Sequence, residues 1–338
     1  MATGFRLVAN KGKSFQGSNV LGKGFILTPE QAEDLIQRDP RNKDVLFPYL
    51  NGEDLNSRPD CSASRWAINF HDWNEERARS YPDVFAIVER DVKPERLKVT
   101  HSKNARLKWW LYERSRPELY GAIADLDRVL VVAQTSRTQM PARVPVGPVF
   151  DQKLVVFPRQ GTADLCFRAS SFQYLWTLRM GSTRTADLVF TPSTCSETLP
   201  QPQNIDSLQA AGASLEAVRN GVMLDRQIGL TKLYTEMHDP EVTDSCIEGL
   251  RNAHSEVDRM VAHAYGWVDL DIECGFHQTS QGLRYTFSPA VQAEILDRIL
   301  ELNHYWHRLE SFNAREKGDE RAMDSWGSGL PPEGDALF

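Results

Sequence analysis

The sequence has few of the features that mark secreted, membrane or zinc-binding proteins. It contains five cysteines, at Cys61, Cys166, Cys195, Cys246 and Cys274. They show no paired spacing, which fits neither a disulfide framework nor a zinc motif. No apolar run approaches the roughly 18 residues that span a bilayer, and the first residues lack the hydrophobic stretch of a signal peptide. We therefore expect a cytoplasmic protein with no membrane segment and no metal site.

Several catalytic loops are missing as well. There is no Walker loop, serine nucleophile elbow or Cys-x-x-Cys pair, so phosphoryl and acyl transfer lack support. A loop that binds S-adenosylmethionine needs glycines between a strand and a following helix. Gly22-Lys23-Gly24 instead precedes the apolar Phe25-Ile26-Leu27. This order indicates an ordinary loop, and we expect no cofactor site in this chain.

Phe47-Pro48-Tyr49 lies close to the Asn/Asp-Pro-Pro-Tyr signature of enzymes that methylate amino groups of DNA bases. In that signature an Asn or Asp accepts a hydrogen bond from the amine of a flipped base, and the aromatic ring stacks on the base. Phe47 stands at the acceptor position here, and its side chain cannot accept a hydrogen bond. We therefore do not expect methyl transfer by this chain alone.

The residues that are present make an ordinary globular composition with an uneven charge. Hydrophobic residues make up 41% and charged residues 25% of the 338 positions. Residues 1–200 carry 28 Lys and Arg against 23 Asp and Glu (+5), and residues 201–338 carry 11 against 23 (−12). Together they give the net charge of −7. Such a split suggests that one part binds a polyanion and the other binds something else.

The densest basic stretch covers residues 90–116, with nine basic and three acidic residues. Trp109, Trp110 and Tyr112 are interleaved with the charges. One interpretation is a solvated helical face whose aromatic rings pack inward. The other is a surface that follows the phosphates of a nucleic acid. In that case Lys103, Arg106 and Lys108 are the candidate phosphate contacts.

Hydrophobic periodicity predicts a mixed α/β (α+β) fold. In the first part we predict helices over residues 28–38, 82–92 and 116–124, and strands over residues 65–70, 128–134 and 153–157. A capping-box pattern, Thr28-Pro29-Glu30-Gln31, opens the first helix. A further apolar helix is predicted over 163–180, ended by the small polar residues 181–185. Prolines at positions 192, 200 and 202 then mark a boundary.

The second part is predicted to be mainly helical. Apolar residues recur at helical spacing over 205–224, 243–264 and 288–309, with a short strand over 283–287. The end of the chain is rich in charge, glycine and proline, and we expect it to be disordered. The predicted domains are therefore 1–203, 204–311 and a tail over 312–338.

Two motifs formally match metal sites. Asp83, Asp91 and Lys93 fit the PD-(D/E)xK pattern of metal-dependent nucleases, in which two carboxylates hold a metal ion. That pattern needs its second half on a strand, whereas Val84, Val88 and Val92 have helical spacing, which favours an amphipathic helix. His304 and His307, with Glu301 one turn earlier, match half of a helical di-metal motif. We interpret these histidines as surface residues, because a second such motif is absent.

A longer resemblance runs along nearly the whole chain. It is carried by residues 14–18, 20–25, 46–56, 66–70, 81–83, 93–96, 128–131, 229–234, 238–240, 264–267 and 300–303. These segments resemble the target-recognition half of large bacterial DNA adenine methyltransferases. That group includes single-chain type II restriction-modification enzymes such as the MmeI-like group, and the related methylases of phage-defence systems.

The resemblance implies a stand-alone DNA-specificity subunit with no catalysis of its own. Its partners would be double-stranded DNA and a separate methyltransferase chain, which would carry the S-adenosylmethionine and dock on the acidic helical part. The alternative from a different class is a nuclease that uses Asp83, Asp91 and Lys93. The resemblance implies that Phe47-Pro48-Tyr49 has a structural role as part of the scaffold. Leu199-Pro200-Gln201-Pro202 departs from the family's Phe-Pro-aromatic-Pro motif.

Carried over by position, the resemblance also names the residues that read bases. They form two segments, namely Gln134, Thr135, Ser136, Arg137, Thr138 and Gln139, and Ser182, Thr183, Arg184, Thr185 and Asp187. Their chemistry suits the major groove, where arginine reads guanine, glutamine reads adenine and aspartate accepts from cytosine. Arg184 is the expected guanine reader, and the alternative is that it only pairs with Asp187.

Overall fold

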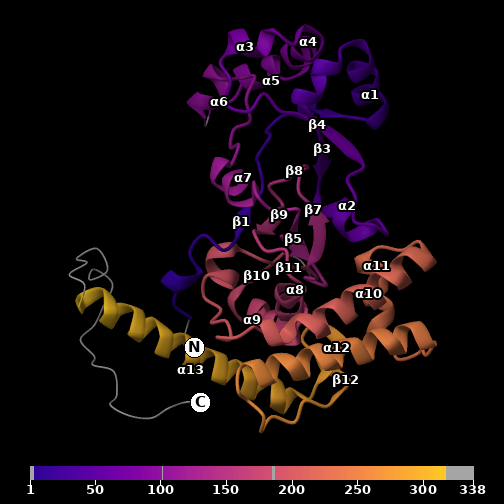
Figure 1. The fold of residues 1–338 in the computed structure, drawn as a ribbon, viewed down its shortest axis with the longest axis vertical. Coiled ribbons are helices and arrows are strands. Elements are labelled where there is room, and N and C mark those ends of the chain that lie inside the picture. The colour runs from indigo at the N-terminus through magenta and orange to yellow at the C-terminus, as the bar shows by residue number, and fades with distance from the viewer. Residues whose placement is uncertain (1–3, 101, 185–186, 317–338) are drawn as a thin grey trace.

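The molecule has an upper and a lower part, which lie one above the other along its long axis (Figure 1). The computed structural model describes residues 4–100, 102–184 and 187–316, and these form two large hydrophobic cores and one small core. The upper core gathers residues between Phe25 and Tyr112 together with Val149, the lower core extends from Leu50 to Ile299, and the small core gathers residues between Leu130 and Cys195. The predicted α/β (α+β) class is confirmed, because several small sheets precede a helical C-terminal region.

The upper part is a four-stranded sheet covered by short helices. The strand order is β2 (Ile26–Leu27), β4 (Arg65–Ile68), β3 (Leu46–Leu50) and β8 (Val149–Phe150). The helices are α1 (Pro29–Arg38), α3 (Glu75–Arg79), α4 (Pro82–Asp91), α5 (Lys93–Leu97) and α6 (Lys103–Leu107). The predicted capping box of α1 is present, since Thr28 Oγ1 accepts from Gln31 N at 3.3 Å and Gln31 Oε1 accepts from Thr28 N at 2.9 Å.

Strands β3 and β8 connect the upper part to the lower part. Tyr49 and Val149 pack in the upper core, whereas the next residues, Leu50 and Phe150, pack in the lower core. The two strands run parallel, with Leu50 opposite Phe150. The short helices α2 (Gly52–Ser57) and α7 (Pro117–Ile123) flank this waist.

The middle of the molecule is a second four-stranded sheet. Its order is β1 (Phe15–Gln16), β9 (Leu154–Phe157), β5 (Arg128–Ala133) and β7 (Ala142–Pro145), with antiparallel pairs throughout. The predicted strands over 128–134 and 153–157 are therefore confirmed. Both are nearly continuous apolar runs because they are buried on both faces. A third sheet, β10 (Ser182–Arg184), β11 (Asp187–Val189) and β6 (Thr135–Ser136), lies beside it.

The lower part is built of helices and one hairpin. The helices are α8 (Thr162–Ala169), α9 (Ser171–Met180), α10 (Gln209–Arg226), α11 (Leu230–Met237), α12 (Ser245–Ala264) and α13 (Pro289–Glu316). The hairpin pairs β12 (Cys274–Thr279) with β13 (Gly282–Phe287). The predicted strand over 283–287 is confirmed, and its partner strand was not predicted. Among the described residues, no helix is both long and apolar enough to cross a membrane.

The predicted single helix over 163–180 is wrong, because Ser170 divides it. Ser170 has an extended backbone (φ −70°, ψ 155°), and its hydroxyl caps α9 by accepting from Gln173 N at 3.4 Å. The same hydroxyl donates to Phe167 O in the last turn of α8 at 2.6 Å. A serine that satisfies both helix ends stabilises a break that hydrophobic periodicity cannot reveal. The polar segment after α9 is strand β10 and not only a loop.

The lower core continues across the predicted domain boundary at residue 203. It joins β5 and β9 to α8, α10, α12 and α13. Helix α10 packs so closely on α8 that a Cβ at Gly212 would lie 1.8 Å from the carbonyl oxygen of Thr162. The division at 203 remains a prediction about independent folding. Helix α13 also continues to Glu316, so the first residues of the predicted tail are helical, and residues 317–338 lie outside the described residues.

Candidate nucleic-acid interface

The two predicted base-reading segments meet in the sheet of β10, β11 and β6. Strand β6 carries Thr135 and Ser136, which lie opposite Val189 and Leu188 of β11. Strand β10 pairs with the other edge of β11. Segments almost 50 residues apart in sequence thus form one continuous surface. Thr185 lies outside the described residues, and Arg184 is described only through its backbone, which pairs with that of Asp187.

Alternation along these strands decides which side chains face outward. Ser182, Val189 and Thr135 stand in one row across the sheet, and Ser182 and Thr135 are exposed. The adjacent row contains Leu188 and Ser136, which are buried. Residues two apart in a strand share a face. Asp187 therefore lies on the outward face with Val189.

Three of the predicted reading residues are buried and support the turn after β6. Ser136, Thr138 and Gln139 are each no more than 6% exposed. Ser136 Oγ accepts from Thr138 N at 3.2 Å, and Gln139 Nε2 donates to Ser136 O at 3.0 Å and to Leu188 O at 2.9 Å. Gln139 holds a left-handed conformation (φ 52°). Among the predicted base-reading residues whose side chains the structure describes, the exposed ones are Thr135, Arg137, Ser182 and Thr183.

Arg137 extends from this turn and pairs with Asp187. Its Nε lies 3.2 Å from Asp187 Oδ1, and its side chain is 70% exposed. An ion pair this exposed contributes under about 1 kcal/mol to stability. Its effect is to orient a long side chain at the edge of the sheet. The acidic neighbour expected for Arg184 is therefore in contact with Arg137.

Thr135 borders a groove between the second sheet and the waist, and the adjacent Gln134 is held through its backbone. Gln134 N donates to Lys153 O at 2.7 Å, and Gln134 O accepts from Phe190 N at 2.7 Å. The groove has a volume of about 490 Å³, and Arg65 and Lys153 are exposed basic residues in its lining. The sequence did not single out these two residues, because each stands alone in a strand or turn without neighbouring basic residues.

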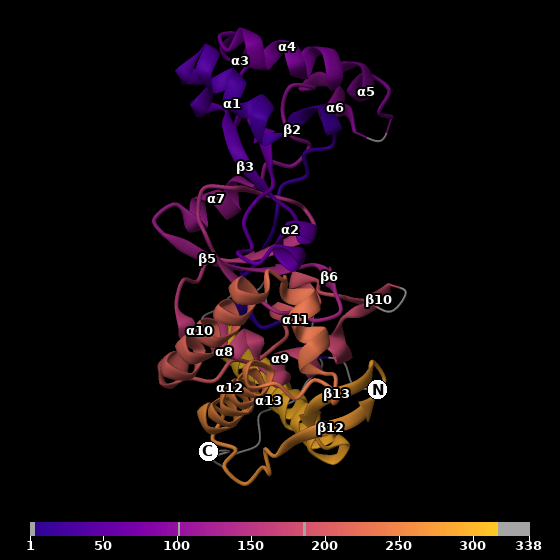
Figure 2. The ribbon, with the colours of Figure 1, turned by 90° about the vertical axis from the view of Figure 1, so that its right-hand side faces the viewer.

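The basic stretch divides into a buried aromatic side and an exposed charged side. Trp109, Trp110 and Tyr112 are buried in the upper core, as the first interpretation of this stretch predicted. Lys103, Arg106 and Lys108 are exposed on or next to α6, and none has an ion pair within the described part of the chain. Figure 2 shows α6 and β10 on the same side of the molecule, above and below the waist.

Phe47-Pro48-Tyr49 lies on β3 as part of the scaffold. The ring of Phe47 meets His71 edge to face at 5.5 Å, and Pro48 lies opposite Trp66 of β4. Tyr49 is buried, and its hydroxyl donates to the carboxylate of Asp151. Burial and the adjacent carboxylate raise the pKa of Tyr49. A tyrosine held inside the protein in this way offers no open face on which a base can stack.

The residues of the nuclease alternative lie on a helix and not on a strand. Asp83 and Asp91 are eight residues apart on α4, which separates them by about 12 Å along the helix axis. Asp91 pairs with Arg90 at 2.7 Å, which lowers the pKa of its carboxyl, and Lys93 pairs with Glu89 at 2.8 Å. Within the described residues, no group of three His, Cys, Asp or Glu side chains is arranged to hold a metal ion.

His304 and His307 pack around an aromatic ring near the amino terminus. The ring of Phe5 stacks on His307 at 4.2 Å and lies 5.1 Å from His304. Burial and the neighbouring His304 lower the pKa of His307 to about 4. This packing gives the pair a structural role in attaching the first residues to α13.

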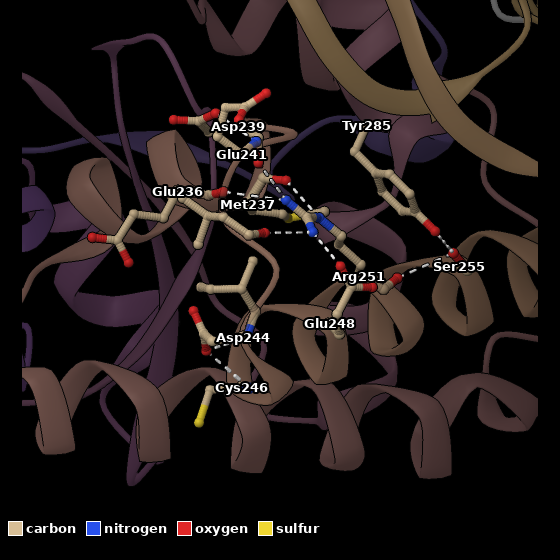
Figure 3. Close-up of polar contacts among 12 residues, drawn as sticks. Glu236, Met237, Asp239, Glu241, Asp244, Cys246, Glu248, Arg251, Ser255 and Tyr285 are labelled. Atoms are coloured by element: carbon tan, nitrogen blue, oxygen red, sulfur yellow. Dashed lines mark hydrogen bonds and ion pairs between the residues drawn. The ribbon is translucent and has the colours of Figure 1, made fainter.

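The loop between α11 and α12 is held by a buried arginine (Figure 3). Arg251 of α12 is 1% exposed. Its guanidinium donates to the carbonyl oxygens of Met237 at 2.9 Å, Asp239 at 2.7 Å and Val242 at 2.8 Å, and it pairs with Glu248. This loop includes His238-Asp239-Pro240, one of the segments of the resemblance. Arg251 therefore fixes the backbone on both sides of His238.

No protein-family model matches this sequence, and no curated protein matches it. The fold, however, recurs within a type IIL restriction-modification enzyme. That enzyme is MmeI, solved in complex with DNA, and the two structures are similar at a TM-score of 0.66 with 16% sequence identity. The similarity covers 87% of this chain and 35% of the MmeI chain, so this chain spans about a third of that protein's length. At this identity the similarity establishes a shared fold.

Proposed function

We propose that this chain reads a DNA target sequence for a separate S-adenosylmethionine-dependent adenine methyltransferase, in restriction-modification or phage defence. The observation that carries the proposal is the joining of the two predicted base-reading segments in one sheet, in which β6 (Thr135–Ser136) pairs with β11 and β11 pairs with β10 (Ser182–Arg184). The sequence predicts base reading for both segments, and the sheet brings them together. The fold shared with MmeI, which was solved with DNA, supports the same assignment.

The exposed side chains of this sheet have the chemistry of direct readout. Arg137 can donate two hydrogen bonds to O6 and N7 of guanine in the major groove. The hydroxyls of Thr135 and Ser182, which share one face of the sheet, can donate or accept, and Asp187 can orient Arg137. A major groove about 12 Å wide admits a two-stranded β-ribbon, and β10 and β11 pair as antiparallel strands.

The proposal assigns DNA binding to the first part of the chain and binding of the methyltransferase to the second part. Lys103, Arg106 and Lys108 would contact phosphates, which position a protein on DNA without reading its sequence. The acidic residues after position 204 repel the phosphates of DNA, so the helical part would bind the methyltransferase chain. Catalysis and S-adenosylmethionine would belong to that partner, because Phe47 cannot accept from a target amine.

A selection experiment with the full chain tests the proposal. The protein is incubated with a randomised double-stranded DNA library, and the bound fraction is sequenced. We expect one short motif to be enriched. Co-purification from the native host should recover a methyltransferase, and methylome sequencing should find that motif modified. Uniform recovery of all sequences would contradict sequence reading, and magnesium-dependent cleavage lost in Asp91→Ala would replace it with the nuclease alternative.

A further inference from the structure

A side chain of the hairpin formed by β12 and β13 contacts the turn after β6, where Arg137 lies. Arg284 lies on β13, opposite His277 of β12. Its Nη2 donates to the carbonyl oxygen of Arg137 at 3.1 Å. The two residues are 147 positions apart in sequence. The helical part and the reading sheet are thus joined at the backbone of Arg137, an exposed arginine in the turn after β6.

The side chain of Arg284 is partly buried beside this contact. Its guanidinium lies 4.8 Å from the centre of the Tyr174 ring, and burial lowers its pKa. Within the described chain, its hydrogen-bond partners are His238 and the Arg137 carbonyl, and neither is a carboxylate. The bond to the Arg137 carbonyl is exposed, and a charged donor forms a stronger hydrogen bond to a carbonyl oxygen than a neutral donor does. The contact therefore joins the Arg137 backbone to a charged side chain of the hairpin.

His238 lies beside the same guanidinium. Tyr285 N lies 3.2 Å from His238 Nδ1, and Arg284 Nη1 lies 3.2 Å from His238 Nε2. Burial, and then the charge of Arg284, lower the pKa of His238 to about 3, so the imidazole is neutral near pH 7. A neutral imidazole has one acceptor nitrogen, so it accepts from Arg284 or from Tyr285 but not from both. The Arg137 carbonyl is an acceptor for Arg284 with either tautomer.

The space behind Arg284 favours a positioning role over ligand binding. Tyr174, Met237 and Arg284 line a partly open cavity of about 50 Å³. Ligand pockets usually measure about 300 to 1,000 Å³. The cavity is therefore small for an organic ligand.

We propose that Arg284 is a positioning residue for Arg137 and through it a determinant of base preference. The proposal rests on the proposed function, because it assigns Arg284 to the same reading surface. Ser136 and Gln139 hold the turn from inside, Asp187 orients the Arg137 side chain, and Arg284 holds the Arg137 backbone from the side of the hairpin. Together these contacts fix the point from which the guanidinium reaches a base.

The experiment compares five full-length proteins by binding selection on a randomised duplex library. They are the wild type, Arg137→Ala, Arg284→Gln, Arg284→Lys and the double variant Arg137→Ala/Arg284→Gln. A sixth protein, Arg259→Gln, is the matched control, because Arg259 is exposed on α12 and forms its ion pair with nearby Glu256. Affinity for a fixed duplex without the motif is measured in parallel.

We expect Arg137→Ala to relax one position of the motif, by about 5- to 150-fold in base discrimination. Arg284→Gln should relax the same position and leave affinity for the unrelated duplex unchanged. Arg284→Lys should retain part of the preference, because an ammonium can still donate to the Arg137 carbonyl. In the Arg137→Ala background, Arg284→Gln should have no further effect, since the side chain that it positions is absent.

Three results would overturn the inference. The first is an unchanged motif in Arg284→Gln. The second is an equal loss at every position, or a further loss in the Arg137→Ala background, which would make Arg284 a general stabiliser. The third result is a wild type that enriches no motif, which overturns the proposed function as well. If Arg284→Gln does not fold, the same criteria apply to Arg284→Lys.

Discussion

At the scale of residues, the proposed reading surface carries Arg137, an exposed arginine whose backbone carbonyl accepts a hydrogen bond from Arg284. In the proposed function, replacing Arg137 by alanine removes both hydrogen bonds to guanine. We expect a loss of about 1 to 3 kcal/mol of discrimination at one base pair. Stability should change by less than about 1 kcal/mol, because the pair with Asp187 is exposed. Competition binding with single-base variants of the selected site measures the first quantity, and denaturant unfolding measures the second.

A loss of affinity that is the same for every single-base variant would show that Arg137 contacts phosphate instead of a base. Arg41 offers a matched control. It is also an exposed arginine with one aspartate partner, Asp39, but it lies in the upper part away from the sheet. Arg41→Ala should leave the motif unchanged.

A second residue-scale prediction concerns His254, which is 5% exposed and hydrogen-bonded to the Tyr234 hydroxyl at 2.7 Å. Burial, and then the charge of Arg219, lower its pKa from 6.5 to about 3. In the unfolded chain the imidazole takes up a proton below pH 6.5, whereas in the folded protein it stays neutral down to about pH 3. Stability is therefore fully present above pH 6.5 and falls as the pH is lowered through this window.

His254→Gln should remove the group that takes up this proton on unfolding. Between pH 4 and 6 the slope of the unfolding free energy should decrease by about 1.4 kcal/mol per pH unit relative to the wild type. Urea unfolding at several pH values gives the slope. An unchanged slope would mean that His254 is protonated in the folded protein.

At the scale of elements, the contact of α8 with α10 depends on the absence of a side chain at Gly212. A Cβ there would overlap the carbonyl oxygen of Thr162, so Gly212→Ala should separate the two helices and destabilise the protein by several kcal/mol. Gly221 lies on the same helix with nothing within 4 Å of its Cβ position. Gly221→Ala should stabilise by up to about 1 kcal/mol, as expected for an exposed helical site. Thermal unfolding compares the two, and equal effects would contradict the packing argument.

Helix α6 gives the second element-scale prediction. Lys103→Gln should weaken binding to all DNA sequences alike and reduce the slope of log K against log salt by about one unit. Lys232 is an exposed lysine of the acidic part and makes only a 3.6 Å contact with Glu236. Lys232→Gln should leave the salt slope unchanged. A change of the preferred motif in Lys103→Gln would show that α6 reads bases.

At the scale of the whole molecule, the chain should depend on a partner for methylation. We expect the purified protein to show no calorimetric binding of S-adenosylmethionine at micromolar affinity and no methylation of the selected duplex. The motivation is the order of glycines and apolar residues around Gly22 and the phenylalanine at position 47. Addition of the co-purified methyltransferase should produce adenine methylation at the selected motif. Binding of S-adenosylmethionine by the isolated chain would contradict this assignment.

Features set by near neighbours in sequence could be predicted. Residues a few positions apart in sequence determine the cap of α1, the apolar faces of α4 and α12, and the buried strands β5 and β9. Strand β12 was missed because its sequence, residues 274–279, alternates only weakly in hydrophobicity. The break at Ser170 was missed because one hydrogen-bonding hydroxyl outweighs the apolar pattern around it.

By itself the sequence determined the α/β class and the division of charge between the two parts. Only the tertiary structure decided which reading candidates are exposed, since pairing of β6 with β11 buries Ser136 and leaves Thr135 outside. It also decided that Asp187 orients Arg137 and that Arg284 supports the same turn. The physical reason is that propensity and periodicity act over a few residues. Contacts across 50 to 147 positions arise only when apolar surfaces pack and the remaining polar groups find partners.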